Sequence, residues 1–251
     1  MQNRYNKNNV YLSEKEQEQI KNCPIIIVGA GVGSVIAECA LRFGFENITI
    51  VDTEKVALSN LSHQNYIEDD INTNAVEAIK KRLIAINKDA KIRVYDNPLT
   101  EDITVSLIKD HKVAINALDF TSEIPLEFDR TCQQKSIPVL HPYNLGWGGL
   151  VTIIAPDGLA LNLLEKPEEM LNEIQIAEYV SSYLKFWRTP HIWIDEVLEK
   201  YKNKDDSFPP AQLSIASWTV ASMCTHLLFN IVTNKEFKKF PEFYLSTVMN
   251  G

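Results

Sequence analysis

Three glycines, Gly29, Gly31 and Gly33, lie in the stretch IIIVGAGVGSVIAE, between a predicted strand and a predicted helix. Glycines at such a turn allow a tight bend and let backbone N–H groups at the helix start approach a phosphate. Asp52 ends the next strand, where a carboxylate can accept hydrogen bonds from ribose hydroxyls. The pattern predicts a nucleotide site. The alternative is a glycine turn that only packs a helix on a strand, because GxGxG is one residue shorter than the usual dinucleotide pattern.

A polar segment follows Asp52. The stretch SNLSHQ contains Asn60, His63 and Gln64, which are too polar for a core and suit contacts with phosphate oxygens. An ordinary NAD-dependent enzyme needs no such segment at this place. An NAD-dependent oxidoreductase would rest on the glycine turn and Asp52 alone, since no hydride-transfer site is recognisable. A different nucleotide is therefore the better interpretation.

The elements that must position these residues follow from the hydrophobic pattern. Short apolar runs alternate with amphipathic stretches from Pro24 onward. In NTNAVEAIKKRLIAIN, for example, Val76, Ile79 and Leu83 share one helical stripe. This βαβα repetition predicts an α/β fold: a doubly wound, mostly parallel Rossmann-like sheet with helices on both faces. A few antiparallel strands, ending in EFYLSTV, are expected at the carboxyl-terminal end.

The middle of the chain departs from this pattern. We expect residues 1–251 to form one nucleotide-binding domain, with residues of about 159–210 as a helical crossover or lid insertion. The pieces QIAEYVSSYLKFW and WIDEVLEKYK are predicted helices within it. Its aromatic residues Phe186, Trp187 and Trp193 either fold the insertion onto the domain or form an aromatic lid over a substrate tail.

Composition narrows the class of protein. The formal net charge of −8 gives no general attraction to nucleic acid or anionic lipid. The amino terminus has no apolar segment typical of a secretory signal, so a cytoplasmic location is expected. The apolar stretch from Leu213 to Val232 carries Ser, Thr, His and Asn on every helical face, which predicts a buried helix and no membrane span.

Four stretches, in order, resemble one family. RYNK (4–7) is similar to an amino-terminal RYxRQ motif, and the strand-end acid followed by SNLSHQ is similar to DxDxVxxSNLxRQ. INALDF, around Asp119, resembles a DxxDN strand end, and NLGWGGLVTII resembles a GxxGxVxV strand. These are motifs of the ubiquitin-activating-enzyme-like adenylyltransferases, the ThiF/MoeB/HesA group, and they span most of the chain.

The resemblance implies an activity. Members of this family bind ATP with Mg²⁺, dimerise, and adenylate the carboxy-terminal carboxylate of a small protein or peptide, often a ubiquitin-like protein or a sulfur carrier. By resemblance, Asp119 binds Mg²⁺, and Lys7 reaches across a homodimer to act with Asp119 and His63 in catalysis. The nucleotide-binding positions implied are Gly29, Gly31, Gly33, Asp52, Glu54, Asn60, Gln64 and Lys80.

The chain departs from the family at three phosphate-facing cations. Lys7 and His63 replace arginines, and Ala75 aligns with a lysine if one residue is skipped. A lysine lacks the bidentate fork of arginine, and a histidine is mostly neutral at neutral pH. Lys80 or Lys81 could substitute, or could lie on a solvated helix face. A catalytically degenerate protein that only binds a nucleotide or a partner is therefore the alternative function.

The positions of the cysteines argue against a zinc site and against a covalent cysteine step. Cys23, Cys39, Cys132 and Cys224 form no CxxC pair, so no zinc is expected. Family members that form thioesters or persulfides carry a cysteine in the crossover, and here none lies between Cys132 and Cys224. A covalent cysteine step is not expected, and the four thiols are predicted to be buried.

Overall fold

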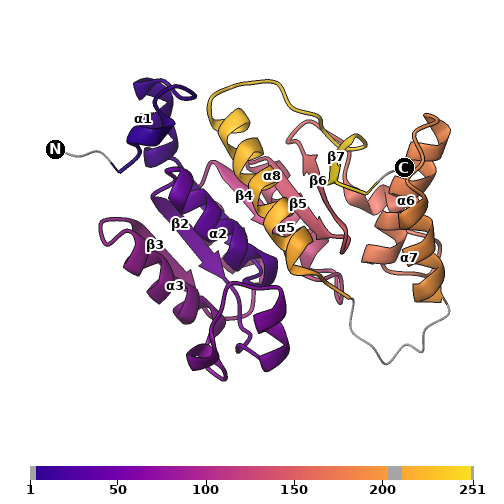
Figure 1. Cartoon of the computed structure of the whole chain (residues 1–251), viewed down its shortest axis with the longest axis horizontal. Coiled ribbons are helices and arrows are strands. Elements are labelled where there is room, and N and C mark those ends of the chain that lie inside the picture. Colours follow the sequence, from indigo (N-terminus) through magenta and orange to yellow (C-terminus); the bar gives the residue numbers. More distant parts are fainter. Residues whose placement is uncertain (1–3, 203–210, 250–251) are drawn as a thin grey trace.

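The computed structural model describes residues 4–202 and 211–249. Its centre is a seven-stranded sheet in the order β3-β2-β1-β4-β5-β6-β7 (Figure 1). The first five strands pair in parallel, whereas β6 pairs antiparallel with both β5 and β7. The predicted sheet is thereby confirmed. The strands are β1 (Pro24–Val28), β2 (Asn47–Val51), β3 (Lys91–Tyr95), β4 (Val113–Asn116), β5 (Val139–Asn144), β6 (Gly148–Ile154) and β7 (Phe243–Thr247).

Helices cover both faces of the sheet. Alternate residues of β1 face opposite clusters of buried side chains: Ile25 and Ile27 contact one, Ile26 and Val28 the other. The first cluster includes α1, α2, α3 and α8, and the second α4, α5, α6 and α7. The helices are α1 (Glu14–Asn22), α2 (Gly31–Phe43), α3 (Ala75–Ile86), α4 (Glu101–Ile108), α5 (Ile124–Gln134), α6 (Glu173–Phe186), α7 (Ile192–Lys202) and α8 (Ser214–Val232).

Hydrophobic periodicity does not predict helix α1, because Ile20 is its only buried residue. Its signal in the sequence is a capping box: the Ser13 hydroxyl accepts from the Glu16 N–H, and the Glu16 carboxylate accepts from the Ser13 N–H. A capping box can therefore mark the start of a helix even where too few residues are buried to give a hydrophobic period in the sequence.

Helix α8 is long and apolar enough to cross a membrane by length and composition. In this fold it packs beside α2 and against β6 (Figure 1), burying Val220, Cys224 and Leu228 in the core. Core helices of globular domains have the same length and composition, and the prediction of a buried helix agrees with this packing.

The crossover helices α6 and α7 pack on the face opposite α8, at the β7 end of the sheet (Figure 1). Two adjacent glycines of β6 allow α7 to pack closely on one face of the strand and α8 on the other. A Cβ on Gly148 would lie 3.3 Å from Cη2 of Trp193 in α7, and a Cβ on Gly149 would lie 2.8 Å from Cγ2 of Val220 in α8. Residues 203–210, the end of the predicted insertion, lie outside the described residues.

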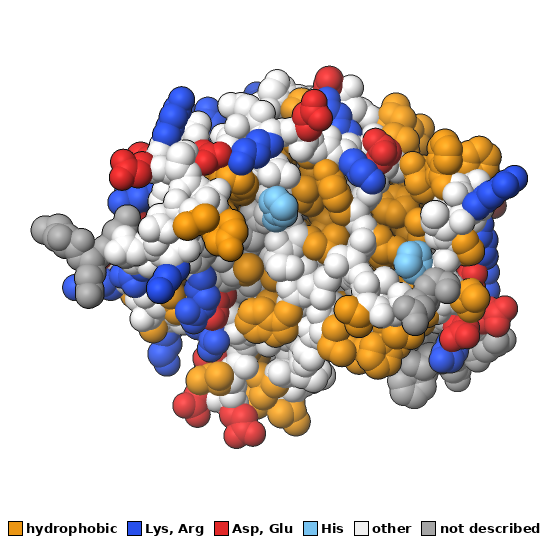
Figure 2. All heavy atoms as spheres, turned by 45° about the horizontal axis from the view of Figure 1, so that its top comes forward, with side chains coloured by type: hydrophobic (Ala, Val, Ile, Leu, Met, Phe, Trp, Pro, Cys, Tyr) orange, Lys and Arg blue, Asp and Glu red, His pale blue; other side chains and the backbone are white. Residues whose placement is uncertain are grey.

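Hydrophobic and charged side chains are distributed unevenly over the surface. Figure 2 shows hydrophobic side chains gathered over the half of the molecule that carries β7 and the crossover helices, with charged side chains towards the rim. Trp193 is buried, whereas Phe186, Trp187 and Ile192, around the turn between α6 and α7, are 77%, 61% and 59% exposed. Of the three aromatic residues singled out in the sequence, Trp193 therefore anchors the insertion, and the other two are available to a partner.

Gly149→Ala should lower the free energy of unfolding by roughly 1–3 kcal/mol, because the added methyl group would overlap both Cγ2 and the backbone nitrogen of Val220. Urea denaturation measures the change. Gly158→Ala is the comparison, since its Cβ would lie 3.3 Å from Ala155, a tight contact without the overlap at Gly149, and it should cost less stability. Equal midpoints for the two variants would contradict this account of the β6–α8 contact.

Candidate functional site

The chain reverses its direction of strand addition between β1 and β4, which are neighbours in the sheet. Ligands of doubly wound folds bind in the crevice outside the carboxyl ends of the strands at such a switch point. A cavity of about 560 Å³ opens there. Its wall contains Gly29 after β1, Asp52 after β2 and Asp119 after β4, so the fold brings these three predicted site residues together.

The glycine turn is shaped by close packing against the end of β4. Gly29 has φ +89°, and a Cβ there would lie only 2.3 Å from the carbonyl oxygen of Ala117. No other residue type fits. Helix α2 then begins at Gly31 without a side-chain cap, so its first N–H groups remain available at the positive end of the helix dipole. This geometry suits a phosphate group.

Asp52 holds the turn as well as lining the cavity. Its Oδ2 accepts a hydrogen bond from the Ala30 N–H at 2.5 Å, and its Oδ1 accepts one from the Glu54 N–H at 2.8 Å. Each carboxylate oxygen keeps a further lone pair, so the group can still accept from a ribose hydroxyl. The residue therefore couples the conformation of the glycine turn to any nucleotide contact.

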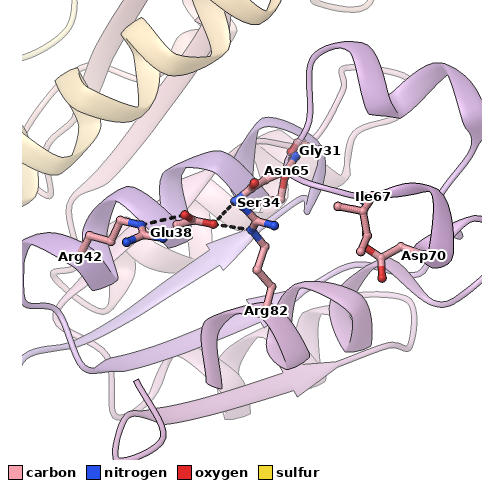
Figure 3. A network of polar contacts seen from close by, with 8 residues as sticks. All are labelled: Gly31, Ser34, Glu38, Arg42, Asn65, Ile67, Asp70 and Arg82. Atoms are coloured by element: carbon pink, nitrogen blue, oxygen red, sulfur yellow. Dashed lines mark hydrogen bonds and ion pairs between the residues drawn. The ribbon is translucent and has the colours of Figure 1, made fainter. Parts of the chain in front are cut away.

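A buried carboxylate fixes the polar segment over α2 (Figure 3). Glu38 accepts from Asn65 Nδ2 at 2.6 Å, from Arg42 Nε at 2.7 Å, and from Arg82 Nε. These bonds hold the pKa of Glu38 below its usual value, although burial opposes them. The Asn65 N–H also donates to the Ser34 hydroxyl at 3.1 Å. The segment that carries Asn60 to Gln64 is thus tied to the first turns of α2.

Within that segment the predicted residues have different neighbours. Gln64 lies in the cavity wall, with its Nε2 3.2 Å from the Cβ position of Gly31. Asn60 turns away: its Oδ1 accepts from the Ala57 N–H at 2.7 Å. His63 contacts Ser62 and Gln64, and partial burial lowers its pKa, which disfavours the charged form.

Gly33 serves packing. A Cβ at this position would lie 2.8 Å from Cγ2 of Ile27, so the glycine lets α2 lie close on β1. It is not among the residues of the cavity wall.

Carboxylates dominate the cavity. Asp52, Glu54, Asp119 and Glu173 line it, and its described wall contains no lysine or arginine. Burial, then the charges of Glu173, Glu54 and Asp52, raise the pKa of Asp119 to about 6, although the residue is exposed at the cavity mouth. Burial and Asp52 likewise raise the pKa of Glu54. A polyanion can enter this cavity only together with a cation.

The predicted cations lie elsewhere in the described chain. Lys7 is exposed in a short 3-10 helix, Asn6–Asn8, which is bonded to the end of α2 at the amino edge of the sheet. The cavity of the same chain lies at the opposite edge of the sheet, where the parallel strands end. Lys80 is half exposed on α3 and lies 3.9 Å from Glu77, outside the cavity wall. Ala75, in the place of the family lysine, is buried in the core.

Several wall residues were not predicted from the sequence. Asn97 lies two residues after the end of β3, and its position after a predicted strand is a signal that could have identified it. Glu173 arrives from the crossover helix α6, where its Oε1 accepts from the Phe120 N–H at 3.0 Å. Tyr143 completes the wall on the β5 side. Trp193, which the sequence offered as either an anchor of the insertion or part of an aromatic lid, completes it on the α7 side. Nothing local in the sequence places these three beside Asp119.

His141 is buried behind the cavity. Its Nε2 lies 2.7 Å from Oδ2 of Asp129, whose Oδ1 accepts from Asn116 Nδ2 at 2.9 Å. His141 and Asp129 are 1% and 3% exposed, so neither can contact a ligand. This buried network supports the loop after β4, where Asp119 lies.

Asn65→Ala should remove a hydrogen bond to a charged group and lower the free energy of unfolding by roughly 1.5–3 kcal/mol. Asn22→Ala is the matched control, because Asn22 donates only to Glu18 on the surface of α1. Chemical denaturation compares the two. If the control loses as much stability as Asn65→Ala, the network around Glu38 does not hold the segment.

Asp119→Asn should raise the melting temperature at pH 8 by roughly 1–3 °C and leave it unchanged at pH 4. The pKa of Asp119 in the folded state, about 6, exceeds its ordinary value of 3.8. The folded protein therefore loses stability as the pH rises through this interval, and asparagine removes the unfavourable charge. Solvent screening keeps the gain small. Asp69→Asn, at an exposed acid, is the control, and an equal gain at both pH values would contradict the prediction.

The sequence of this chain is similar to those of known proteins. Over 110 residues the chain is 30% identical to "Ubiquitin-like modifier-activating enzyme 5" of Caenorhabditis briggsae, covering 42% of this chain and 26% of that protein. Over 139 residues it is 27% identical to "Molybdopterin-synthase adenylyltransferase" of Haemophilus influenzae, covering 55% and 57%. The chain thus spans between a quarter and three fifths of the length of these two relatives.

Solved structures share the fold. E. coli MccB with ATP superposes with a TM-score of 0.70 at 14% identity, covering 99% of this chain and 72% of that one. PaaA superposes with a TM-score of 0.65 at 19% identity, covering 93% and 72%. The sequence profile of the ThiF family matches residues 5–249. The chain therefore belongs to the ThiF family.

Proposed function

We propose that this protein is an ATP-dependent adenylyltransferase that activates the carboxy-terminal carboxylate of a small protein or peptide. The observation that carries the proposal is the cavity at the switch point, which joins the glycine turn, Asp52 and Asp119. Each of these three has the chemistry that one part of Mg-ATP requires. The uncapped start of α2 suits a phosphate, Asp52 a ribose, and Asp119 a divalent cation.

Relatives and structural neighbours support the proposal. One relative is named molybdopterin-synthase adenylyltransferase, and others are named ubiquitin-like modifier-activating enzymes. Among the neighbours with the same fold are E. coli MccB with ATP and MccB with MccA. The proposed partner is accordingly a ubiquitin-like protein, a sulfur-carrier-like protein or a peptide with a free carboxyl terminus.

The acidic cavity fits Mg²⁺ together with phosphates. The described residues hold no group of three or more His, Cys, Asp or Glu side chains arranged to bind a metal on their own. Mg²⁺ commonly binds through one or two carboxylates plus substrate phosphates and water. Asp119 would hold the ion, which supplies charge neutralisation at the phosphates. The prediction that no zinc is bound remains untested.

The residues of this chain would act on the reaction by position. The glycine turn and the start of α2 hold the α-phosphate, and Asp52 fixes the ribose. Asp119 would hold the cation, which would supply positive charge at the phosphates. A carboxylate oxygen forms a bond to the α-phosphorus, the bond between that phosphorus and the bridging oxygen breaks, and pyrophosphate leaves with the electron pair. Holding the two anions in line removes much of the barrier.

The site requires a cation from outside its described wall, and we propose that a homodimer supplies it. Lys7 is exposed at the amino edge of its own sheet, where it cannot reach its own cavity. A second copy would bring that lysine to the acidic cavity. The exposed Phe186 and Trp187 offer a separate surface to the substrate protein. We further propose that the whole chain works as one domain in the cytoplasm.

One observation favours a second candidate. The acidic wall without lysine or arginine, with buried Ala75 in the place of the family lysine, suits a protein that binds a nucleotide or a partner without turning it over. The two candidates differ in whether pyrophosphate is formed.

Asp119→Ala should abolish Mg²⁺-dependent ATP binding and lower ATP–pyrophosphate exchange by roughly 100-fold or more, since the cation would lose its protein ligand. Calorimetry measures binding, and the exchange assay uses peptides with free carboxyl termini and their amidated counterparts. Asp69→Ala, at an exposed acid, is the control.

Two results would decide between the candidates. Exchange that needs a free carboxylate and disappears in Asp119→Ala supports the transferase. ATP binding without exchange, for every carboxylate tested, supports the non-catalytic protein. Mg²⁺-dependent ATP binding that survives in Asp119→Ala would overturn the assignment of the metal ligand.

A further inference from the structure

The cavity has a second end that the nucleotide contacts do not explain. The glycine turn and Asp52 lie on the β1 and β2 side, and Asp119 follows β4, in the middle. Beyond Asp119, on the β5 side, the wall is formed by the crossover helix α7 and the end of β5. Its residues are largely apolar: Pro142, Tyr143, Leu145, Trp193, Ile194 and Val197.

Two hydrogen-bond donors at this end lack partners within the described chain. They are the Tyr143 hydroxyl and Trp193 Nε1, in side chains that are 7% and 4% exposed. Leaving a buried donor unpaired is energetically costly, so native proteins rarely do so without a reason. Both residues line the cavity, although the two donor atoms themselves are buried, so a bound molecule with carbonyl oxygens would supply the missing acceptors once a small shift of the wall uncovers them.

Both rings are held in place before any ligand arrives. The Tyr143 ring stacks with Phe120 and His141, at centroid distances of 6.5 and 6.1 Å. The Trp193 indole packs against Gly148, 3.3 Å from where a Cβ would lie. His141 in turn is fixed by Asp129. Fixed donors lose little conformational entropy on binding, which favours affinity for a molecule of matching shape.

We propose that this end of the cavity binds a bulky apolar side chain of the residue that carries the reacting carboxylate. As the tail enters and shifts the wall slightly, the buried donors of Tyr143 and Trp193 bind its backbone carbonyl oxygens. The substrate class is thus a peptide or protein ending in a large aliphatic or aromatic residue, in contrast to a tail that ends in glycine. This inference rests on the proposed function, because the carboxylate must lie near Asp119 for the side chain to reach α7.

Peptide binding tests the inference directly. N-acetyl-Gly-Gly-Leu and N-acetyl-Gly-Gly-Gly, both as free acids, are titrated into the full chain by calorimetry, with Mg²⁺ and a non-hydrolysable ATP analogue and again without nucleotide. The leucine peptide should bind roughly 10- to 100-fold more tightly, as expected for a buried aliphatic side chain. Equal affinities, or no binding of either peptide in either condition, would overturn the inference.

Two variants separate the apolar end from the rest of the site. Val197→Asp, at a half-buried wall residue, should remove the preference for leucine and leave the affinity for the ATP analogue unchanged. Val248→Asp, at a valine that is 94% exposed, is the control and should change neither. A loss of analogue affinity in Val197→Asp would show that the nucleotide itself occupies this end, and would refute the inference.

Tyr143→Phe keeps the experiment decisive if Val197→Asp does not fold. Because the hydroxyl has no partner among the residues that the structure describes, its removal should leave the melting temperature unchanged or higher. Binding of the leucine peptide should nevertheless weaken, by roughly three- to tenfold. A lower melting temperature with unchanged peptide affinity would mean that the hydroxyl serves the fold.

Failure of the ATP analogue to bind would count against the proposed function, while the comparison of peptides without nucleotide still decides the substrate class.

Discussion

The contact between Gly29 and the carbonyl oxygen of Ala117 is the constraint on which the site depends. It exists because β1 lies between β2 and β4 with its last residues in register with both, so that Val28 pairs with Val51 and with Asn116. The three strand ends then meet at one place. A side chain on Gly29 would push β4 away and separate the glycine turn from Asp119. Secondary structure alone would not prevent this, and only glycine permits the approach.

The same crowding sets the electrostatics of the cavity. Carboxylates from β2, β4 and α6 converge at the strand ends, where partial burial strengthens their mutual repulsion. The raised pKa of Asp119 reflects this repulsion. Energy stored in this way is released when a cation binds, so the site is prepared for an ion or for a positively charged group of a second copy. Arg42 and Arg82 pair with the buried Glu38, whose other partner is Asn65 of the loop, so these two arginines lie outside the cavity wall.

The crossover links the apolar end of the cavity to the core of the fold. The adjacent glycines of β6 let α7 approach one face and α8 the other, and the α7 contact brings Trp193 and Val197 to the edge of the cavity. A helix that in sequence looks like an insertion thereby becomes a wall of the site. Because this wall is apolar and the opposite end is polar, the two ends of the cavity suit the two different parts of the proposed acyl-adenylation reaction.

The sequence by itself determined the alternation of strands and helices, the doubly wound class, the glycine turn and the family motifs, because these depend on local periodicity and on spacing along the chain. It also identified Gly29, Gly31, Asp52, Glu54, Gln64 and Asp119, all of which line the cavity. Strand ends are readable from sequence, and parallel strands deliver them to one edge.

Only the tertiary structure decided the rest. It placed Lys7 at the far edge of the sheet, Lys80 outside the wall and Gly33 in a packing contact. It also brought Glu173, Tyr143 and Trp193 to Asp119 from positions 24 to 74 residues away along the chain. The physical reason is that side-chain direction and long-range packing, which no local pattern encodes, determine which residues share a cavity.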